Sequence, residues 1–213
     1  MRYAVAAWVT FGLVCGVACE LAGCGSSPPS SFYALSPESG AAHPSSFRTI
    51  KLRRPGIAGY LDRPDIVKTI IDHRLRANDT DRWAAPLDEM LGRVLAEDLE
   101  ERLPGSVVFT EDGAITADAE ATIEIDLRRF EVGAGGDVNL VAEVALEKGD
   151  AHVPAGTRAV RLKQAPSAPG TSALVETMSE MLGKLADEIA ALVRASGVSG
   201  TDGAGSPDGG AAP

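Results

Sequence analysis

Few residues of this chain have the types and spacing that support chemistry. The three histidines, His43, His73 and His152, are far apart, and none has a neighbouring pattern of metal ligands. There is no Gly-x-Ser-x-Gly motif, and no glycine-rich loop lies between an expected strand and an expected helix. The carboxylates of Glu97–Asp98 and Glu100–Glu101 fall on an amphipathic pattern, where we expect them to form the solvated face of a helix. The sequence therefore gives no argument for catalysis, a cofactor or a metal site.

One cysteine, Cys24, lies in a context that supports covalent modification. It ends the run Leu21-Ala22-Gly23-Cys24, after a positive residue at Arg2 and an apolar stretch over residues 3–19. This pattern is typical of a secretory signal peptide, and with a cysteine after the small residues it resembles the lipobox of bacterial lipoproteins. The resemblance implies cleavage before Cys24, followed by acylation of its thiol and of the new amine. Several acyl chains on one residue hold a protein firmly on a bilayer.

An ordinary signal peptide or a transmembrane anchor is the alternative interpretation of this N-terminus. The apolar stretch is short for a bilayer span, which needs about 20 residues, and Glu20 interrupts it. Gly25 after the cysteine is not Asp, so nothing here resembles the inner-membrane retention signal of known bacterial lipoproteins. We therefore expect an outer-membrane anchor that faces the periplasm.

Charge and cysteine content exclude several classes of protein. The 213 residues carry a net charge of −10, and Arg2 and Glu20 cancel, so cleavage would leave that charge unchanged. Nucleic acid and lipid headgroups are anionic, so we expect neither a nucleic-acid site nor a headgroup-binding face. Cys15 and Cys19 would leave with the signal peptide. The folded part would then have no free thiol, disulfide or cysteine metal ligand.

The charges are segregated along the chain. Residues 48–76 hold eight Lys and Arg against three Asp, a net of +5, whereas residues 77–126 hold fourteen acids against three Arg, a net of −11. Two solvated faces that neutralise each other on folding would explain this. A polarised surface that orients the protein against a partner is the alternative.

Hydrophobic periodicity predicts an α+β fold. Strands are expected at 32–35, 47–53, 65–71, 106–110, 121–132, 138–146 and 157–163, and helices at 86–103 and 172–195. Residues 55–64 hold two Pro and two Gly and predict an ordered, partly buried turn. Residues 73–76 continue the preceding strand or begin a return strand, and residues 78–81 are expected to turn. A change of apolar phase predicts a bulge near Arg128–Arg129, and Gly133–Gly136 predicts a hairpin.

These elements predict one domain with a simple organisation. Its antiparallel or mixed sheet should carry the two long amphipathic helices on it. The expected divisions are a lipoprotein signal peptide at 1–23, a Ser/Pro tether at 24–31, the folded domain at 32–196 and a disordered tail at 197–213.

Three stretches together carry a resemblance to a known family. They are Phe32-Tyr33-Ala34-Leu35, then residues 60–67 (YLDRPDIV), and then residues 82–87 (RWAAPL) running into 93–99 and 103–105. In this order they resemble the ABC-type transport auxiliary lipoprotein family, which includes the PqiC (YmbA-like) lipoproteins. The resemblance covers residues 32–192 and is most specific between 59 and 105.

This resemblance implies a role without catalysis. Family members work in the Gram-negative periplasm with an inner-membrane MCE-domain protein and, in some systems, an ABC transporter. Together they are thought to move lipids or other hydrophobic molecules and to maintain membrane integrity. We therefore expect a docking module, with an MCE-domain protein and the bilayer as partners, and a homo-oligomer as a further possibility.

Aromatic and arginine side chains dominate binding energy at interfaces, and they suggest where a partner would bind. The candidates are Tyr60, Leu61, Asp62, Arg63, Arg82 and Trp83. In the alternative interpretation Tyr60 and Trp83 pack in the core, and Asp62 pairs with Arg63 or Arg82 to hold the turn. The rival function is a periplasmic carrier that holds an acyl chain between the sheet and the helices.

Overall fold

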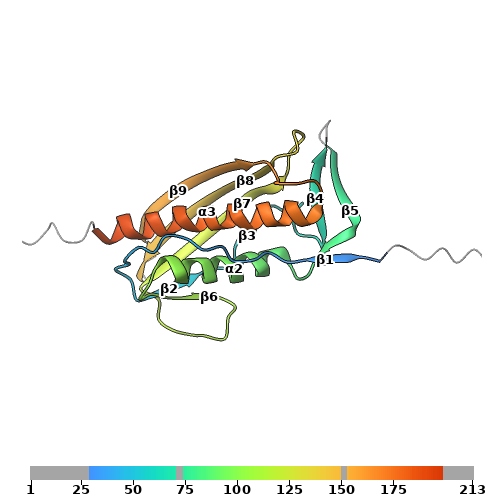
Figure 1. The fold of residues 1–213 in the computed structure, drawn as a ribbon. Helices are drawn as coiled ribbons and strands as arrows, with labels where there is room; N and C mark the ends of the chain where they lie inside the picture. Colours follow the sequence, from blue (N-terminus) through green and yellow to red (C-terminus); the bar gives the residue numbers. More distant parts are fainter. Residues whose placement is uncertain (1–28, 71–73, 150–152, 199–213) are drawn as a thin grey trace, which may run out of the picture.

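A computed structural model of the chain describes residues 29–70, 74–149 and 153–198 (Figure 1). The expected signal peptide, Cys24, His73 and His152 lie outside these residues, as does the tail from residue 199. Within these described ranges, nine strands and two helices follow in order. They are β1 (Ser31–Tyr33), β2 (Thr49–Leu52), β3 (Gly56–Ile57), β4 (Asp65–Ile70), β5 (Arg74–Trp83), α2 (Leu87–Arg102), β6 (Val107–Thr110), β7 (Ala121–Val132), β8 (Val138–Lys148), β9 (Val153–Gln164) and α3 (Thr171–Val198).

Strand β7 is the centre of a single mixed sheet. One edge pairs antiparallel with β8, which pairs antiparallel with β9. The other edge is shared along its length by three parallel neighbours, β2, then β3, then β4. Strand β4 continues the sheet through β5 to β1, and β2 continues it to β6. The predicted hairpin forms between β7 and β8, where the Gly133 amide donates to the Asp137 carbonyl at 2.7 Å, and the predicted bulge appears as a register shift between Leu127 and Arg129.

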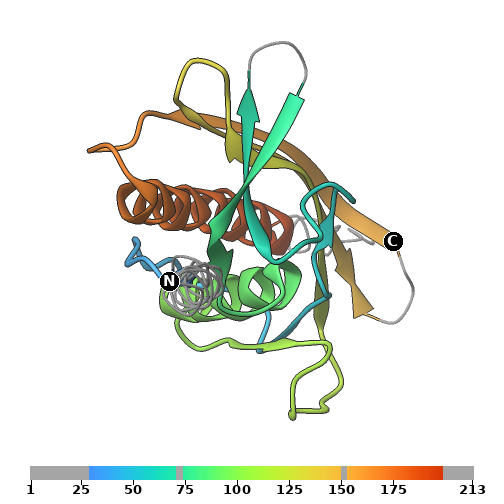
Figure 2. The same cartoon turned by 90° about the vertical axis from the view of Figure 1, so that its right-hand side faces the viewer.

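Both helices pack within the curl of the sheet, as Figures 1 and 2 show. Their predicted apolar stripes are buried, from Leu87 to Leu99 in α2 and from Leu174 to Val193 in α3. Because a stripe with a spacing of three and four residues covers one helical face, each helix can bury that face, α2 against β6 and α3, and α3 against α2, β8 and β9. The inward side chains of β7 lie in the same core. These alternate along the strands, for example Ile123 and Ile125 on β7. The α+β prediction is therefore confirmed, with a mixed sheet.

One predicted turn is wrong. Residues 78–81 were expected to turn, because Asn, Asp and Thr are typical turn residues. They lie inside β5, which pairs with β4 at residues 74–77 and 82 and with β1 at residues 81–83. The segment beginning at Arg74 is thus the return strand, and the residues with turn preference fall where the pairing register between β4 and β5 shifts.

The proline- and glycine-rich segment at 55–64 is ordered and partly buried, as predicted. It also contains the short strand β3, which the sequence did not indicate. At the other end of the domain, α3 continues through Gly197 to Val198, so the helix passes the expected boundary at residue 196.

Candidate partner-contact site

The structure brings together the two stretches that hold the candidate contact residues. The turn at 58–64 is closed by two backbone hydrogen bonds, from Leu61 N to the Ala58 carbonyl at 2.8 Å and from Arg63 N to the Leu61 carbonyl at 2.8 Å. The Trp83 amide then donates to the Pro64 carbonyl at 2.7 Å, which holds the end of β5 against this turn. All six candidates therefore lie in one region, although they are separated by some twenty residues in the sequence.

Two of the six candidates are core residues. Leu61 is 2% exposed and Trp83 is 5% exposed, and both belong to the main hydrophobic cluster. Their side chains support the surface from beneath. The alternative interpretation, in which Trp83 packs in the core, therefore describes its position.

Tyr60 is partly buried and is held by hydrogen bonds. Its hydroxyl donates to Glu131 Oε2 at 2.6 Å and lies 3.2 Å from the Arg128 carbonyl. Burial, together with the hydrogen bond to the Glu131 carboxylate, raises the pKa of Tyr60 above its ordinary value. The same carboxylate oxygen also accepts the Phe130 amide at 3.0 Å. Tyr60 thus ties the turn to β7 at the bulge.

The polar candidates remain at the surface. Arg82 Nε lies 3.5 Å from Asp65 Oδ1, across the β4–β5 pair. This ion pair takes the place of the expected pair between Arg82 and Asp62. Asp62 and Arg63 are exposed. They line a surface cleft of about 370 Å³ whose wall is formed by Pro64, Trp83, Ala85, Pro86 and Leu87. A partner bound in the cleft would contact its apolar walls, the carboxylate of Asp62 and the guanidinium of Arg63.

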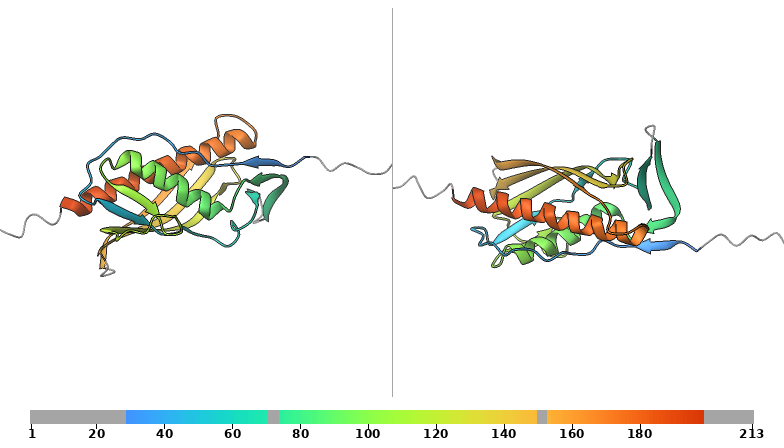
Figure 3. Two further views of the ribbon diagram at one scale, coloured as in Figure 1. Left: turned by 90° about the horizontal axis from the view of Figure 1, so that it is seen from below. Right: turned by 45° about the horizontal axis from the view of Figure 1, so that its top comes forward.

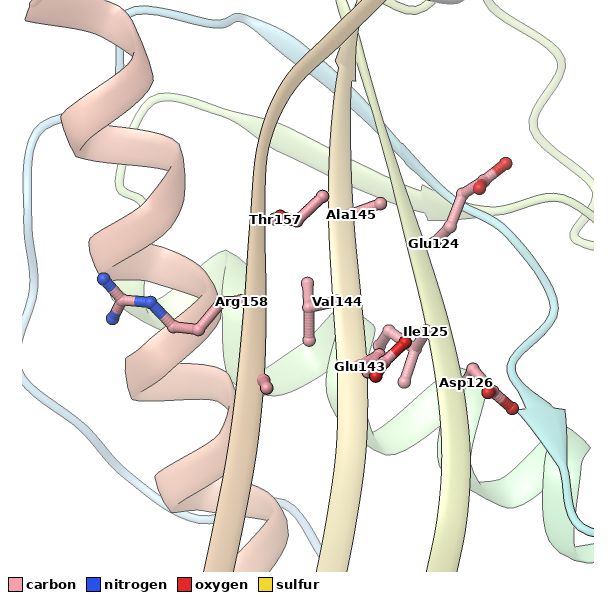
Figure 4. Close-up of a pocket in the computed structure, with 9 residues that line it drawn as sticks. Glu124, Ile125, Asp126, Glu143, Val144, Ala145, Thr157 and Arg158 are labelled. Atoms are coloured by element: carbon pink, nitrogen blue, oxygen red, sulfur yellow. The ribbon is translucent and has the colours of Figure 1, made fainter.

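A second groove, of about 500 Å³, is open to solvent and runs across the strands β7, β8 and β9. Figure 4 shows its lining across β7, β8 and β9. Glu124 faces Ala145 and Thr157 in one row of the ladder, and Asp126 faces Glu143 in the next. An acyl chain needs predominantly apolar walls, and this groove presents three carboxylates. It therefore does not favour the lipid-carrier alternative.

A buried pair of charged residues that the sequence analysis missed, Asp98 and Arg102, lies within α2, and Arg102 links it to α3. Asp98 was expected on the solvated face of α2, and that expectation is wrong, because Asp98 is fully buried. Arg102, one turn further on, is 1% exposed. Glu97, Glu100 and Glu101 are exposed as predicted.

Arg102 binds two other segments of the chain, α3 and the segment around Glu38. Its Nε donates to Asp187 Oδ1 of α3 at 2.6 Å, its Nη1 to the Glu38 carbonyl at 2.8 Å, and its Nη2 to the Gly183 carbonyl at 3.1 Å. Asp98 Oδ1 accepts the Glu38 amide at 2.7 Å and lies 3.9 Å from Arg102 Nη1. The pair therefore fastens the 34–47 segment across α2 and α3.

Burial raises the pKa of Asp98 to about 6, against the opposing effects of the Glu38 amide and Arg102. A signal for this pair was present in the sequence. Leu91, Leu95, Asp98 and Arg102 are spaced by four, three and four residues, which places Asp98 and Arg102 on the buried stripe.

The described residues give no sign of metal chemistry or of a membrane span. Within residues 29–70, 74–149 and 153–198, no three His, Cys, Asp or Glu side chains are grouped so that they could hold a metal ion. His43 in this part of the chain lies 3.0 Å from Arg194 Nη1. Neither α2 nor α3, the helices of the described ranges, is apolar enough over a sufficient length to cross a membrane.

Two solved structures share the fold of this chain over most of their length. A crystal structure of protein XCC0632 from Xanthomonas campestris superposes with a TM-score of 0.67 at 17% identity, covering 80% of this chain and 98% of the other. A crystal structure described as an uncharacterized protein gives a TM-score of 0.66 at 21% identity, covering 77% of this chain and 98% of the other. Similarity at this level of identity shows a shared fold.

A weaker likeness, with a TM-score of 0.45 at 10% identity, is to the PelC dodecamer from Paraburkholderia phytofirmans, covering 74% of this chain and 95% of the other. It carries no argument for this chain. No curated protein matches the sequence. The family model of the ABC-type transport auxiliary lipoprotein component matches residues 33–190, which is most of the chain and nearly all of its folded part. The chain therefore belongs to the ABC-type transport auxiliary lipoprotein family.

Proposed function

We propose that this protein is the membrane-anchored docking component of an MCE-type ABC transport system for lipids or other hydrophobic molecules. In this role it has no catalytic activity, and it maintains the integrity of the envelope from the periplasmic side of the outer membrane. The family match over residues 33–190 is the observation that carries the proposal. The partner-contact cleft, with its exposed charges on a rigid support, is consistent with docking.

The proposed anchor is an acylated Cys24. Ser31, the first residue of β1, is seven residue steps from Cys24, with six residues between them. An extended chain spans at most about 3.3–3.6 Å per residue, so the tether would hold the domain within about 25 Å of the bilayer. Labelling with palmitate and the mass of the mature N-terminus test this step, and a mature protein with an unmodified Cys24 would overturn it.

The proposed contact surface consists of Asp62 and Arg63, which line the cleft, together with Tyr60 and Arg82 beside it. Leu61 and Trp83 lie beneath it and keep its backbone fixed. A preformed surface loses little conformational entropy when a partner binds. Arg63 is exposed and lines the cleft, so it can be replaced without removing core packing.

Affinity capture from envelope extracts tests the proposed docking. We expect the wild-type protein to retain an MCE-domain protein in a fixed ratio, and Arg63→Glu to reduce the retained amount about tenfold, as for a residue worth about 1.4 kcal/mol at an interface. Arg93→Glu is the matched control. Arg93 is also exposed, on the outer face of α2, and pairs with Glu97 at 3.0 Å.

Two results would contradict the proposal. Equal retention by the wild type, Arg63→Glu and Arg93→Glu would exclude Arg63 from the contact. A purified protein that carries stoichiometric lipid and retains no protein partner would favour the carrier function instead, and native mass spectrometry distinguishes the two.

A further inference from the structure

We propose that the groove between α2 and β6 binds an extended segment of another protein, which carries lysine or arginine side chains and adds to the sheet as a further strand. This α2–β6 groove shares no lining residue with the partner-contact cleft. The inference therefore goes beyond the proposed docking function and does not depend on it.

Strand β6 has one paired edge. It pairs in parallel with β2, and within residues 29–70, 74–149 and 153–198 no strand pairs with its other edge. The Val107 amide donates to the carbonyl of Arg48, just before β2, at 2.8 Å. Since backbone N–H groups alternate in direction along a strand, those of Val108 and Thr110 point away from β2. An edge of this kind can pair with an added strand.

The α2–β6 groove lies at this edge and has a volume of about 280 Å³. Its lining comes from one face of α2, from residues 108–110 of β6 and from residues 112–115 of the loop that follows β6. Helix α2 contacts β6, and the loop projects from the domain beside them (Figures 1 and 3). Val108 is 5% exposed and belongs to the main hydrophobic cluster, so the floor of the groove is anchored in the core.

Carboxylates dominate the polar lining of the α2–β6 groove. They belong to Glu89, Glu97, Glu100 and Asp112, against the guanidinium of Arg93. Arg93 Nη1 already pairs with Glu97 Oε1 at 3.0 Å. Glu100 and Asp112 are exposed, and neither forms an ion pair with another residue in the part of the chain that the structure describes. Two negative charges therefore remain for a cationic partner to neutralise.

The groove also has an apolar contact point. Ile115, on the loop side, is 55% exposed. Successive side chains of an added strand point in opposite directions. A segment in which basic and apolar residues alternate can therefore direct its cations at carboxylates such as Glu100 and its apolar side chains at Ile115. Its backbone would pair with the outward N–H groups of Val108 and Thr110.

A second copy of this chain fits the groove less well. Pairing of two β6 edges about a two-fold axis would bring the same carboxylates of both copies together, and like charges opposite one another are destabilising. Charge complementarity therefore favours a different, basic chain.

Fluorescence anisotropy of labelled peptides, with the full processed chain in a neutral detergent, tests the site. The probe is a short peptide of alternating lysine and valine. A peptide of alternating glutamate and valine has the opposite charge. An N-methylated lysine–valine peptide keeps the charge of the probe but lacks the N–H groups that strand pairing needs. Hydrogen exchange in the presence of the probe locates the contact.

We expect both control peptides to bind at least about tenfold more weakly than the lysine–valine peptide. Glu100→Lys with Asp112→Lys should weaken binding of that peptide by a similar factor. Asp62→Lys with Glu176→Lys, which changes the net charge equally at exposed residues outside the groove, should leave its affinity unchanged. The probe should slow amide exchange at residues 107–111 and leave exchange in the edge strand β1 as it was.

Equal affinity for the three peptides, equal weakening by the two charge-reversed variants, or unchanged exchange in β6 would overturn the proposal. A chain that is dimeric by light scattering, with β6 protected in the dimer, would assign the edge to a second copy and would also overturn it. Retention of the MCE-domain protein through Arg63 is measured separately, so each of these results leaves the proposed docking function intact.

Discussion

At the scale of single residues, the Asp98–Arg102 pair matters most for the stability of the fold. Taking both charges out of water is costly, and the pair stabilises the fold only because its hydrogen bonds are largely satisfied. The Arg102 guanidinium donates hydrogen bonds to four acceptors, which lie in α2, in α3 and at Glu38. Removal of Arg102 leaves Asp98 buried without its cationic neighbour.

Arg102→Met is therefore expected to lower the free energy of unfolding by about 3–5 kcal/mol. Urea denaturation followed by circular dichroism measures the change. Arg93→Met is the control, because the exposed Arg93–Glu97 pair contributes about 0.5 kcal/mol or less. Equal losses in the two variants would show that burial does not set the energy of the Asp98–Arg102 pair.

Stability should also depend on the protonation of Asp98. Its pKa is raised from 3.8 in the unfolded chain to about 6 in the fold, so the folded state binds this proton more tightly. The resulting contribution to stability is fully present below about pH 3.8 and is lost as the pH rises through about 6. Asp98→Asn removes this titration.

The free energy of unfolding of the wild type minus that of Asp98→Asn should therefore increase as the pH is lowered from about 7.5 to about 4.5. Use of the difference cancels groups that titrate in the opposite sense, such as Asp88, whose pKa the hydrogen bond from Arg54 lowers. Parallel pH profiles of the two proteins would contradict the expectation.

At the scale of elements, helix α3 is positioned by its close approach to the 34–47 segment. Gly183 permits this approach. A Cβ added there would lie 2.8 Å from the Cβ of Glu38 and 3.4 Å from Arg102 Nη2. Gly92 of α2 is also buried, but a Cβ there would meet its nearest neighbour, Pro55 Cδ, at an ordinary 3.5 Å. The two glycines therefore have different roles in otherwise similar helices.

Gly183→Ala should destabilise the protein by about 1–3 kcal/mol, because overpacking outweighs the gain of up to about 1 kcal/mol in helix propensity. Gly92→Ala should gain about 0.5–1 kcal/mol, since only the propensity changes. Thermal and urea unfolding of both variants measure the effects. Stabilisation by Gly183→Ala would contradict this expectation, because it would show that the 34–47 segment can move away from the added Cβ at little cost in free energy.

At the scale of the whole molecule, β7 unites the fold. Four strands pair with it, three on one edge and β8 on the other. The β1 and β6 strands each pair with one neighbour and are short. The cleft lined by Asp62, Arg63 and Trp83 lies beside β1, whose Tyr33 pairs with Trp83.

Native-state hydrogen exchange should follow this hierarchy. Amides of β7 and β8 should exchange with free energies close to that of global unfolding, and those of β1 and β6 should exchange through local opening at much lower free energies. Mass spectrometry of exchanged peptides measures both. Equal protection of β1 and β7 would contradict the central position of β7 in the cooperative unit.

The sequence by itself determined both helices, most of the strands and the class of fold. Alternation in 121–132 and 138–146, the bulge near Arg128–Arg129 and the stripes of the two helices all depend on local periodicity, which the chain carries without its partners. The family was also recognisable from the sequence, because residues 32–35, 60–67 and 82–87 hold its motifs in order.

Only the tertiary structure decided which polar residues are buried and which candidate residues are exposed. Asp98 and Arg102 are buried because a distant segment and α3 satisfy their hydrogen bonds, and Trp83 is in the core because β5 pairs with both β1 and β4. Residues 78–81 continue a strand because β5 is paired with β4 before them and with β1 from Asp81 onward. Burial and pairing depend on contacts between residues far apart in sequence, and local preference does not specify these contacts.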